Sequence, residues 1–445
     1  MKLSRYNWFI HKQGSALAFN CVSCGFAELE LSTFEALKAL GSGTLLPEQQ
    51  ARLTELLPEL KRGRFVVEDE EDEVRTLRAQ HNVDKYRSPS LQLTIAPTLG
   101  CNFRCIYCYQ EENLRSPAMN AEVQQAILDY VSEVIKRFER LDITWFGGEP
   151  LLETDIIYHL SEELIRICDE HECHYNAGII TNGWLLSRQI AERLREYKVS
   201  MVQVTLDGPP EIHNARRVSK GGCGTFDRIL QNVAAVTDLF HLPVRINVDK
   251  TNAHCILELY ELLHDRQLLD KIHPYCGKVI AETPACADFT PCVLDTAEFA
   301  KMEAEMYQNL KSRRIFAPPP YPRFLSNYCG VTRLSSYVVD PLGRLYKCWN
   351  VIGVDEAAVG NILNPKQLNM PRLAKWLSIE PFEIPECREC EVLPLCSGGC
   401  PHYYYSGEYE KSGRPNCVPW RYSLDELLLV HYKAWKEGPN EQDNA

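Results

Sequence analysis

Cysteine is the feature that most constrains how this chain can fold. The sequence contains 19 cysteines among 445 residues, an odd number that cannot pair completely into disulfides. Its N-terminus lacks the long apolar segment of a signal peptide. We therefore expect a cytoplasmic protein whose thiols stay reduced, and in that compartment clustered cysteines indicate bound metal.

Composition excludes several classes of protein. Apolar residues make up 45% of the chain and charged residues 24%, which is typical of a globular protein and argues against extensive disorder. The net charge of −12 argues against nucleic acid as a partner, because nucleic-acid binders usually carry a basic face. No run of 18 apolar residues occurs, so we expect no membrane span.

The order of expected elements divides the chain into three domains and a tail. These are an N-terminal module (1–90), a strand–helix repeat (91–317), a cysteine-rich segment (318–427) and a tail (428–445). The elements expected in the module are Tyr6–Ile10 and Ala16–Phe19 as strands, Ser32–Leu40 and Pro47–Lys61 as helices, and Phe65–Val67 as a strand. This order is typical of a small winged-helix-like module, with Ser32 or Thr33 capping its first helix. The acidic run Glu68–Glu73 predicts a solvated helix start.

The second segment alternates strands with amphipathic helices. Its expected strands are Leu91–Ala96, Leu141–Phe146, Tyr175–Ile180, Met201–Leu206, Val244–Val248 and Tyr275–Ile280. Such repeats predict an α/β fold with a parallel sheet. Six repeats rather than eight predict a partial (β/α)6 TIM-like barrel, with its site at the carboxyl ends of the strands.

A compact cysteine motif follows the first of these strands. Cys101, Cys105 and Cys108 have the spacing CxxxCxxC. Three thiolates on one loop can bind three irons of a cubane cluster and leave the fourth iron open, unlike a closed four-cysteine cluster. The alternative is zinc, but a structural zinc site needs four ligands and this stretch offers three cysteines and no histidine.

The third segment carries a second set of cysteines in a stretch rich in Pro and Gly. These seven are Cys329, Cys348, Cys387, Cys390, Cys396, Cys400 and Cys417. A segment with so little apolar periodicity cannot build a large core alone, which favours stabilisation by metal. Two zinc ribbons are the alternative, although seven ligands do not divide into two closed four-cysteine sites.

The CxxxCxxC motif, with Tyr107 before its third cysteine, resembles the signature of the radical S-adenosylmethionine (SAM) superfamily. The resemblance implies a [4Fe–4S] cluster on Cys101, Cys105 and Cys108, with SAM bound to the open iron. It also implies reductive cleavage of SAM to a 5′-deoxyadenosyl radical, which abstracts hydrogen from a substrate.

Motifs at later strand ends resemble the SAM-binding regions of the same superfamily. The resemblance assigns to this pocket Tyr107, Gly147, Gly148, Glu149, Thr181, Asn182, Thr205 and Arg217. The two glycines would let the backbone approach a ligand closely. By analogy Glu149 would accept from the SAM ammonium, Thr205 would bond a ribose hydroxyl, and Arg217 would bind the SAM carboxylate.

The C-terminal cysteine pattern resembles the SPASM domain, which holds auxiliary iron–sulfur clusters in radical SAM enzymes that modify peptides. The resemblance implies a first auxiliary cluster on Cys329, Cys348 and Cys400. It implies a second auxiliary cluster on Cys387, Cys390, Cys396 and Cys417. The first lacks one protein ligand, which Cys292 or Cys286 would supply, with Cys292 preferred.

These resemblances imply a maturase of ribosomally made peptides. The N-terminal module is similar in layout to precursor-recognition elements, which add a leader segment to their sheet edge as an extra strand. A thioether crosslink is the favoured product, and a carbon–carbon link, epimerisation or decarboxylation is the alternative. Formylglycine formation, as in sulfatase-maturing enzymes, is disfavoured because those enzymes carry an Asp that acts as a base where this chain has Trp349. The expected partners are the precursor peptide and an electron donor of the flavodoxin or ferredoxin type.

Two other classes of protein fit the sequence less well. A protein that uses its clusters only to carry electrons needs no SAM pocket, so the open three-cysteine motif argues against it. An enzyme that modifies RNA is disfavoured by the acidic net charge.

Overall fold

The structure, a computed structural model, describes residues 1–12, 14–110, 117–280, 289–315, 317 and 319–437. It divides into two compact units. Unit 1 comprises residues 1–86, 318–329 and 379–445, and unit 2 comprises residues 87–317 and 330–378. The N-terminal module and much of the cysteine-rich segment, which the sequence separates into different domains, thus share one unit.

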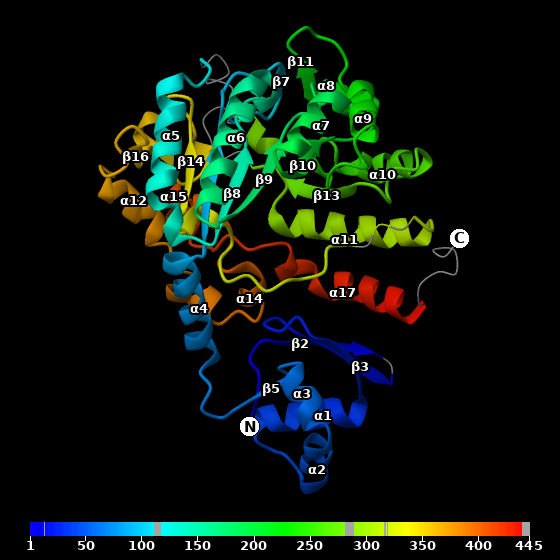
Figure 1. Cartoon of the computed structure of the whole chain (residues 1–445). Coiled ribbons are helices and arrows are strands. Elements are labelled where there is room, and N and C mark those ends of the chain that lie inside the picture. The colour runs from blue at the N-terminus through cyan, green and yellow to red at the C-terminus, as the bar shows by residue number, and fades with distance from the viewer. Residues whose placement is uncertain (13, 111–116, 281–288, 316, 318, 438–445) are drawn as a thin grey trace. The chain divides into compact units, whose positions relative to one another are not determined.

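Unit 2 is built on a nine-stranded sheet with the order β13-β12-β10-β9-β8-β6-β14-β15-β16 (Figure 1). Its strands are β6 (Ser90–Ile95), β8 (Arg140–Trp145), β9 (His174–Ile180), β10 (Val199–Thr205), β12 (Pro243–Val248), β13 (His273–Lys278), β14 (Ser336–Val339), β15 (Arg344–Tyr346) and β16 (Gly360–Asn361). The six strands expected from sequence are present within two residues of their predicted bounds, and neighbouring members pair in parallel. The parallel α/β architecture is therefore confirmed. The last three strands were not expected; β14 joins β6 in parallel, and β15 and β16 continue antiparallel.

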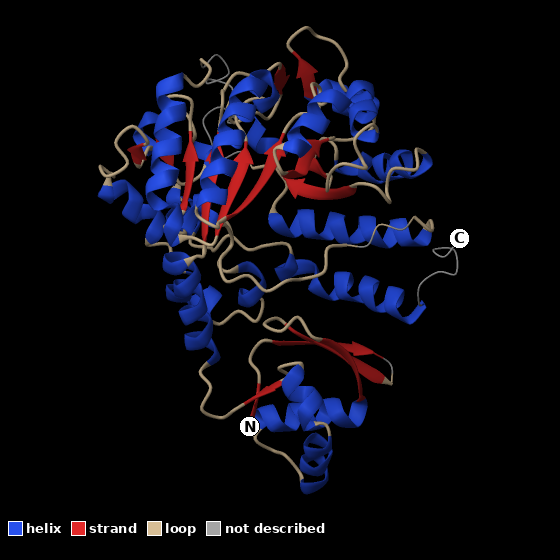
Figure 2. Ribbon diagram, viewed as in Figure 1, coloured by secondary structure: helices blue, strands red, loops and turns tan. Residues whose placement is uncertain are grey.

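Helices lie beside the sheet of unit 2 (Figure 2), and all of them except the last connect its parallel strands in the sequence. They are α5 (Ala121–Val134), α6 (Thr154–Glu170), α7 (Arg188–Glu196), α8 (Pro210–Arg216), α9 (Phe226–Ala234), α10 (Ile256–Asp265), α11 (Thr296–Ser312) and α12 (Met370–Leu377). Apolar side chains at helical spacing bury one face of these helices, as at Val123, Ile127 and Val131 of α5.

The strands of this sheet present an apolar face and a polar face. In β12, Val244, Ile246 and Val248 are buried, whereas Arg245 and Asn247 between them are partly exposed. Because successive side chains point to opposite faces, this alternation places polar groups together on the second face. We call it the polar face of the sheet.

A partly buried acid on α11 provides a test of the packing at the β13 edge. Glu303 lies near Tyr307 and Cys276, and burial raises its pKa from 4.5 to about 7. The folded protein therefore binds this proton more tightly than the unfolded chain does. Its contribution to stability is complete below about pH 4.5 and is lost as the pH rises through about 7.

We expect Glu303→Gln to remove about 1–3 kcal/mol of pH-dependent stability, because the glutamine does not ionise. Thermal unfolding at pH 5 and pH 8 measures the effect. The variant's midpoint should change less between these pH values than that of the wild type. Glu305→Gln, an exposed site on the same helix, is the matched control. An identical pH dependence of wild type and Glu303→Gln would contradict the expectation.

Unit 1 contains a three-stranded antiparallel sheet, in the order β2-β3-β4. Its N-terminal elements are β1 (Lys2–Leu3), β2 (Asn7–Lys12), β3 (Ser15–Asn20), β4 (Phe26–Glu30), α1 (Leu31–Ser42), α2 (Pro47–Glu55), α3 (Leu57–Arg62), β5 (Val66–Val67) and α4 (Glu73–Arg87). One face of the sheet packs on these helices, with Ala16 and Ala18 against Phe34 and Leu37.

The C-terminal part of unit 1 is mostly helical. Its helices are α13 (Pro385–Arg388), α14 (Leu393–Cys396), α15 (Pro401–Tyr405), α16 (Glu408–Ser412) and α17 (Trp420–Glu437). Residues 428–437, part of the expected tail, thus continue α17.

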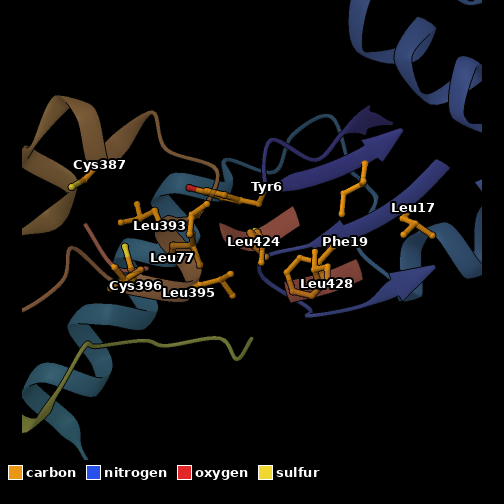
Figure 3. Packing of buried hydrophobic residues seen from close by; sticks show 14 of the residues in the cluster. Tyr6, Leu17, Phe19, Leu77, Cys387, Leu393, Leu395, Cys396, Leu424 and Leu428 are labelled. Carbon is orange, nitrogen blue, oxygen red and sulfur yellow. The ribbon is translucent and has the colours of Figure 1, made fainter. Parts of the chain in front are cut away.

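One hydrophobic core joins the N-terminal sheet to the cysteine-rich segment (Figure 3). It includes Leu17 and Phe19 of β3, Leu424 and Leu428 of α17, and the thiol-bearing Cys396. The cysteine-rich segment, which lacks a periodic apolar pattern of its own, therefore completes its core with residues from the other end of the chain.

Some local expectations for the N-terminal module were wrong. The first helix begins after Glu30 without a side-chain cap, and Thr33 is buried and accepts a hydrogen bond from Arg52. The expected second helix is two helices, α2 and α3, separated at Leu56. At the end of the acidic run Glu73 is buried, where its carboxylate accepts from Ser4 Oγ (2.7 Å) and Arg5 N (2.9 Å).

Among the described residues, no helix combines the length and apolar character required to cross a membrane.

Candidate active site

The three cysteines of the CxxxCxxC motif lie on the segment that follows β6. Within it β7 (Phe103–Cys105) pairs antiparallel with β11 (Arg217–Ser219), so that Cys105 is the register partner of Arg217. The Phe103 N–H donates to Cys101 Sγ at 3.3 Å. Two motifs that are about a hundred residues apart in the sequence are therefore held together by backbone pairing.

The thiols of this segment are partly buried and close enough to repel one another when charged. Burial raises the pKa of Cys101 to about 12, with Cys105 and Cys108 adding smaller contributions. Burial also raises the pKa of Cys105, against the opposing effect of Arg217. A bound metal removes these protons, because thiolate is the form that ligates it. Clustered thiols beside an arginine therefore fit an iron–sulfur cluster, whose thiolate ligands carry the negative charge that the arginine balances.

The two glycines after β8 pack directly against the backbone of the cysteine loop. A Cβ on Gly147 would lie 2.2 Å from the Thr98 carbonyl oxygen, and one on Gly148 would lie 2.3 Å from that of Gly100. Gly147 also has φ of 127°, which disfavours other residues. The backbone approach that we expected toward a ligand is, in the structure, an approach to the loop that carries the cysteines.

Glu149 connects the ends of β8 and β9. Its buried carboxylate accepts hydrogen bonds from Leu151 N (3.0 Å), Thr181 Oγ1 (2.7 Å) and Asn182 N (2.8 Å). Burial raises its pKa, and the donors from Asn182 and Thr181 oppose that rise. Three of roughly four acceptor positions are used within the chain, so one remains for the SAM ammonium that the resemblance assigns to this residue.

Asn182 extends this network to the cysteine loop. Its Nδ2 donates to Asn102 Oδ1 at 2.7 Å. Glu149, Thr181 and Asn182, all predicted site residues, are therefore brought together by the structure.

Tyr107 is the centre of a second network on the polar face. Its hydroxyl donates to Asp207 Oδ2 and accepts from Arg217 Nη1 (2.9 Å) and Asn247 Nδ2 (3.1 Å). Burial raises the pKa of Tyr107 well above its usual value, so the phenol keeps the proton that it donates. The network ties the aromatic residue of the cysteine motif to β11, to β12 and to the segment that follows β10.

The adjacent arginines 216 and 217 have different environments. Arg216 Nη2 pairs with Asp249 Oδ2 at 2.6 Å, and both side chains are almost completely buried. Arg217, also buried, has no ion pair among the described residues, and its Nε has no hydrogen-bond partner there. A buried arginine with an unsatisfied donor fits an anionic ligand, such as the SAM carboxylate that the resemblance assigns to it.

Thr205 ends β10 on the same side of the sheet. It is buried, and its hydroxyl makes no hydrogen bond to other described residues. Its predicted role toward the SAM ribose stays a prediction, as do the roles of the other pocket residues.

A second group of thiols lies wholly within unit 1. Burial raises the pKa of Cys387 to about 12, with Cys417 and Cys390 adding repulsion. Burial raises the pKa of Cys396 to about 12 as well, with contributions from the same two neighbours and Cys387. Four neighbouring thiols, two of them buried, fit the second auxiliary cluster that the resemblance assigns to them.

The ligands expected for the first auxiliary cluster are divided between the units. Cys329 and Cys400 belong to unit 1, and Cys348 belongs to unit 2. Cys292 precedes α11, where its carbonyl accepts from Lys250 N at 2.8 Å, and Cys286 lies outside the described residues. The choice of fourth ligand stays a prediction.

Within the described ranges, no three or more His, Cys, Asp or Glu side chains are arranged to hold a single metal ion. A cubane cluster binds each cysteine through a different iron, so its ligands are spaced more widely than those of one ion.

Sequence reasoning missed two residues of the polar face, Asn247 and Arg245. Asn247 bonds Tyr107, and its backbone N–H donates to Asp207 Oδ1 at 3.0 Å. The signal was the alternating sequence Val-Arg-Ile-Asn-Val of the strand, which indicated two polar side chains on one face.

Residues 95–263 match the model of the Radical SAM superfamily. The chain therefore contains a radical SAM domain, which spans the cysteine loop and the strand ends described above, and it is an enzyme. A [4Fe–4S] cluster and SAM are the cofactors of this superfamily.

Similar proteins include enzymes that modify other proteins and peptides. Cysteine-type anaerobic sulfatase-maturating enzyme of Clostridium perfringens (strain 13 / Type A) is 25% identical over 335 residues, covering 70% of this chain and 89% of that enzyme. Mycofactocin maturase MftC of Mycobacterium tuberculosis is 26% identical over 358 residues, covering 73% of this chain and 82% of that maturase. The protein is thus similar to radical SAM maturases.

Solved structures share the fold. Native anSMEcpe with bound AdoMet and Cp18Cys peptide has a TM-score of 0.57 and 20% identity, covering 78% of this chain and all of that one. Streptococcus suis SuiB bound to precursor peptide SuiA has a TM-score of 0.53 and 15% identity, covering 94% of this chain and 98% of that one.

Proposed function

We propose that this protein is a peptide maturase that installs a crosslink in a ribosomally made precursor. The observation that carries the proposal is the single hydrophobic core shared by the N-terminal sheet and the segment with four clustered thiols. A recognition module and a cysteine-rich segment that fold as one unit are suited to a substrate that is bound at one point and modified at another. The radical SAM maturases to which the chain is similar make a peptide substrate the favoured class.

In this proposal Cys101, Cys105 and Cys108 hold the cluster, and Glu149 and Arg217 bind the two ends of the SAM amino-acid group. When bound, these cofactors supply a 5′-deoxyadenosyl radical that abstracts hydrogen. The chain's own residues orient SAM and exclude water. Tyr107 holds Arg217 through its hydroxyl, and the packed glycines fix the cysteine loop.

The N-terminal module binds the leader segment of the precursor. Its sheet has β2 and β4 as outer strands, and either one offers backbone groups to an added strand. The core beneath is filled from both sides of the sheet, which favours a preformed binding edge.

A thioether is the favoured product of the proposed reaction. An auxiliary cluster on Cys329, Cys348 and Cys400 would keep one position open for a substrate thiol, unless Cys292 fills it. The cluster on Cys387, Cys390, Cys396 and Cys417 would accept the electron released by bond formation. A flavodoxin or ferredoxin in the cytoplasm would supply the first electron, and no nucleic acid takes part.

Other products of a radical SAM maturase remain the alternative, including a carbon–carbon link, epimerisation, decarboxylation and formylglycine. The similarity to sulfatase-maturating enzymes favours the last of these. Formylglycine formation is disfavoured by Trp349, because sulfatase-maturing enzymes carry at this position an Asp that acts as a base. The Trp349 ring stacks on Phe146 with centroids 5.4 Å apart, at an interplanar angle of 28°.

Co-expression with a short peptide encoded beside the gene, under anaerobic conditions, tests the proposal. Each crosslink should lower the intact mass of the peptide by two hydrogens, and fragmentation should locate the bond. A Cys101→Ala/Cys105→Ala/Cys108→Ala variant is the control, with which the peptide mass should not change. SAM cleavage by the wild type with an unmodified peptide would contradict this pairing of enzyme and substrate class.

A further inference from the structure

Among the described residues, the guanidinium group of Arg245 has no anionic partner. Its Nε donates to Asn247 Oδ1 at 2.7 Å. Across the described part of the chain, its two Nη groups make no hydrogen bond and no ion pair. The side chain is partly buried on the polar face, where an unpaired charge is unfavourable.

Residues of the neighbouring strand β13 pack around this guanidinium. On β13, a Cβ at position 277 would lie 2.5 Å from Arg245 Cζ, so Gly277 leaves room for the guanidinium where it lies in the structure. The neighbouring Tyr275 ring has its centre 5.9 Å from Cζ, within cation–π range. Its hydroxyl donates to Gln203 Oε1 at 2.8 Å, which fixes the ring.

Strand register places this arginine beside the SAM pocket. Arg245 is the register partner of Thr205 on one side and of Tyr275 on the other. Asn247, which holds Arg245 Nε, is also bonded to the hydroxyl of Tyr107. Arg245 therefore lies in the same side-chain network as predicted SAM-binding residues, but it makes none of their ion pairs.

We propose that Arg245 is a specificity-determining residue that binds a carboxylate of the peptide substrate. Asn247 holds one nitrogen, and no described residue bonds the other two, which leaves a planar fork of the kind that binds a carboxylate through two parallel hydrogen bonds. The carboxylate belongs to an Asp or Glu side chain or to the C-terminus of the peptide. Binding it would fix which residue of the peptide lies next to SAM. This inference rests on the proposed peptide substrate.

The test uses the full-length enzyme and the peptide that the co-expression experiment identifies. Binding of that peptide and of SAM is measured separately for wild type, Arg245→Gln and Arg245→Lys. We expect Arg245→Gln to weaken peptide binding about 10- to 100-fold, since a charge-assisted pair is lost, and to leave SAM binding unchanged. Arg245→Lys should have an intermediate effect, because it keeps the charge but not the fork.

Peptide variants identify the carboxylate. Each Asp or Glu is replaced by Asn or Gln, and in a separate peptide the C-terminus is amidated. One of these peptide changes should weaken binding to the wild-type enzyme by the same factor as Arg245→Gln does. The same peptide change should not alter binding to the Arg245→Gln enzyme, because the two substitutions remove the same contact.

Arg193→Gln is the matched control, since Arg193 also lies over a tyrosine ring (4.1 Å from Tyr158) but on exposed α7. Equal peptide affinity of wild type and Arg245→Gln would overturn the inference, as would a loss of SAM binding that matches the loss of peptide binding. If the wild-type enzyme modifies no peptide, the proposed function itself is wrong. That outcome differs from failure of the Arg245 inference, in which the peptide is modified but Arg245→Gln binds it as tightly as wild type.

Discussion

Gly148→Ala is expected to lower the rate of 5′-deoxyadenosine formation by about 100-fold or more. The added methyl group would lie 2.3 Å from the Gly100 carbonyl oxygen and 2.4 Å from that of Leu99. Both contacts are backbone atoms of the cysteine loop, so no side chain can turn away to relieve them. The loop must move, and a displacement of about 1 Å near reacting groups can cost 10²-fold in rate.

The structural effect of Gly148→Ala should be confined to the cysteine loop and its contacts. The Glu149 N–H donates to the Gly100 carbonyl at 2.9 Å, so displacement of the loop also disturbs the network around Glu149. We expect iron content and SAM affinity to fall, while thermal stability falls by about 1–3 kcal/mol, as for other overpacking changes.

Gly221→Ala is the matched control for Gly148→Ala. It makes the same chemical change at a position where a Cβ meets nothing within 4 Å, so its activity should equal that of wild type. Nearly normal 5′-deoxyadenosine formation by Gly148→Ala would mean that the loop tolerates the methyl group. The close packing of glycine on the cysteine loop would then not position the cluster.

The parallel sheet could be predicted because each strand carries its own signal. Alternating or continuous apolar residues in stretches such as Val244–Val248 specify a strand whatever its neighbours are. The added strands β14–β16 carry no such signal. They are two to four residues long and are stabilised by pairing with the existing edge at β6, which depends on tertiary contacts.

The composition of the candidate site was predictable, but the bonds within it were not. Motif spacing indicated Glu149, Thr181 and Asn182 separately, and only the meeting of β8 and β9 makes them one hydrogen-bond network. Likewise, the resemblance gave Arg217 a role, but nothing in the sequence indicated that the adjacent Arg216 is buried in an ion pair with Asp249. The two side chains have different partners, Thr251 for Arg216 and Tyr107 for Arg217, and both partners are distant in sequence.

Arg216→Met is expected to destabilise the protein by about 3–5 kcal/mol, the usual cost of leaving a buried charge unpaired. The loss should lower the midpoint of thermal unfolding by roughly 6–20 °C. Arg216 also donates to Thr251 Oγ1 (2.6 Å) and to the Asn247 carbonyl (3.2 Å), and its Nε lies 3.6 Å from Asp207 Oδ2. Its removal therefore leaves the carboxylates of Asp207 and Asp249 buried without their cation.

Arg217→Met makes the same chemical change one residue later and should have the opposite profile. No carboxylate pairs with Arg217 among the described residues, so the thermal midpoint should change by only a few degrees. SAM affinity should fall about 10- to 100-fold, since a charge-assisted contact to the SAM carboxylate is lost. Calorimetry measures the first quantity for both variants, and equilibrium binding of SAM measures the second.

A second substitution separates charge from packing in Arg216→Met. If the unpaired carboxylate is the cause, Arg216→Met/Asp249→Asn should regain part of the lost stability, because the double variant no longer buries that negative charge. If Arg216→Met and Arg217→Met lost stability equally and bound SAM equally, the two arginines would share one role. In that case the unsatisfied Nε of Arg217 would reflect packing alone, and the assignment of this residue to the SAM carboxylate would be wrong.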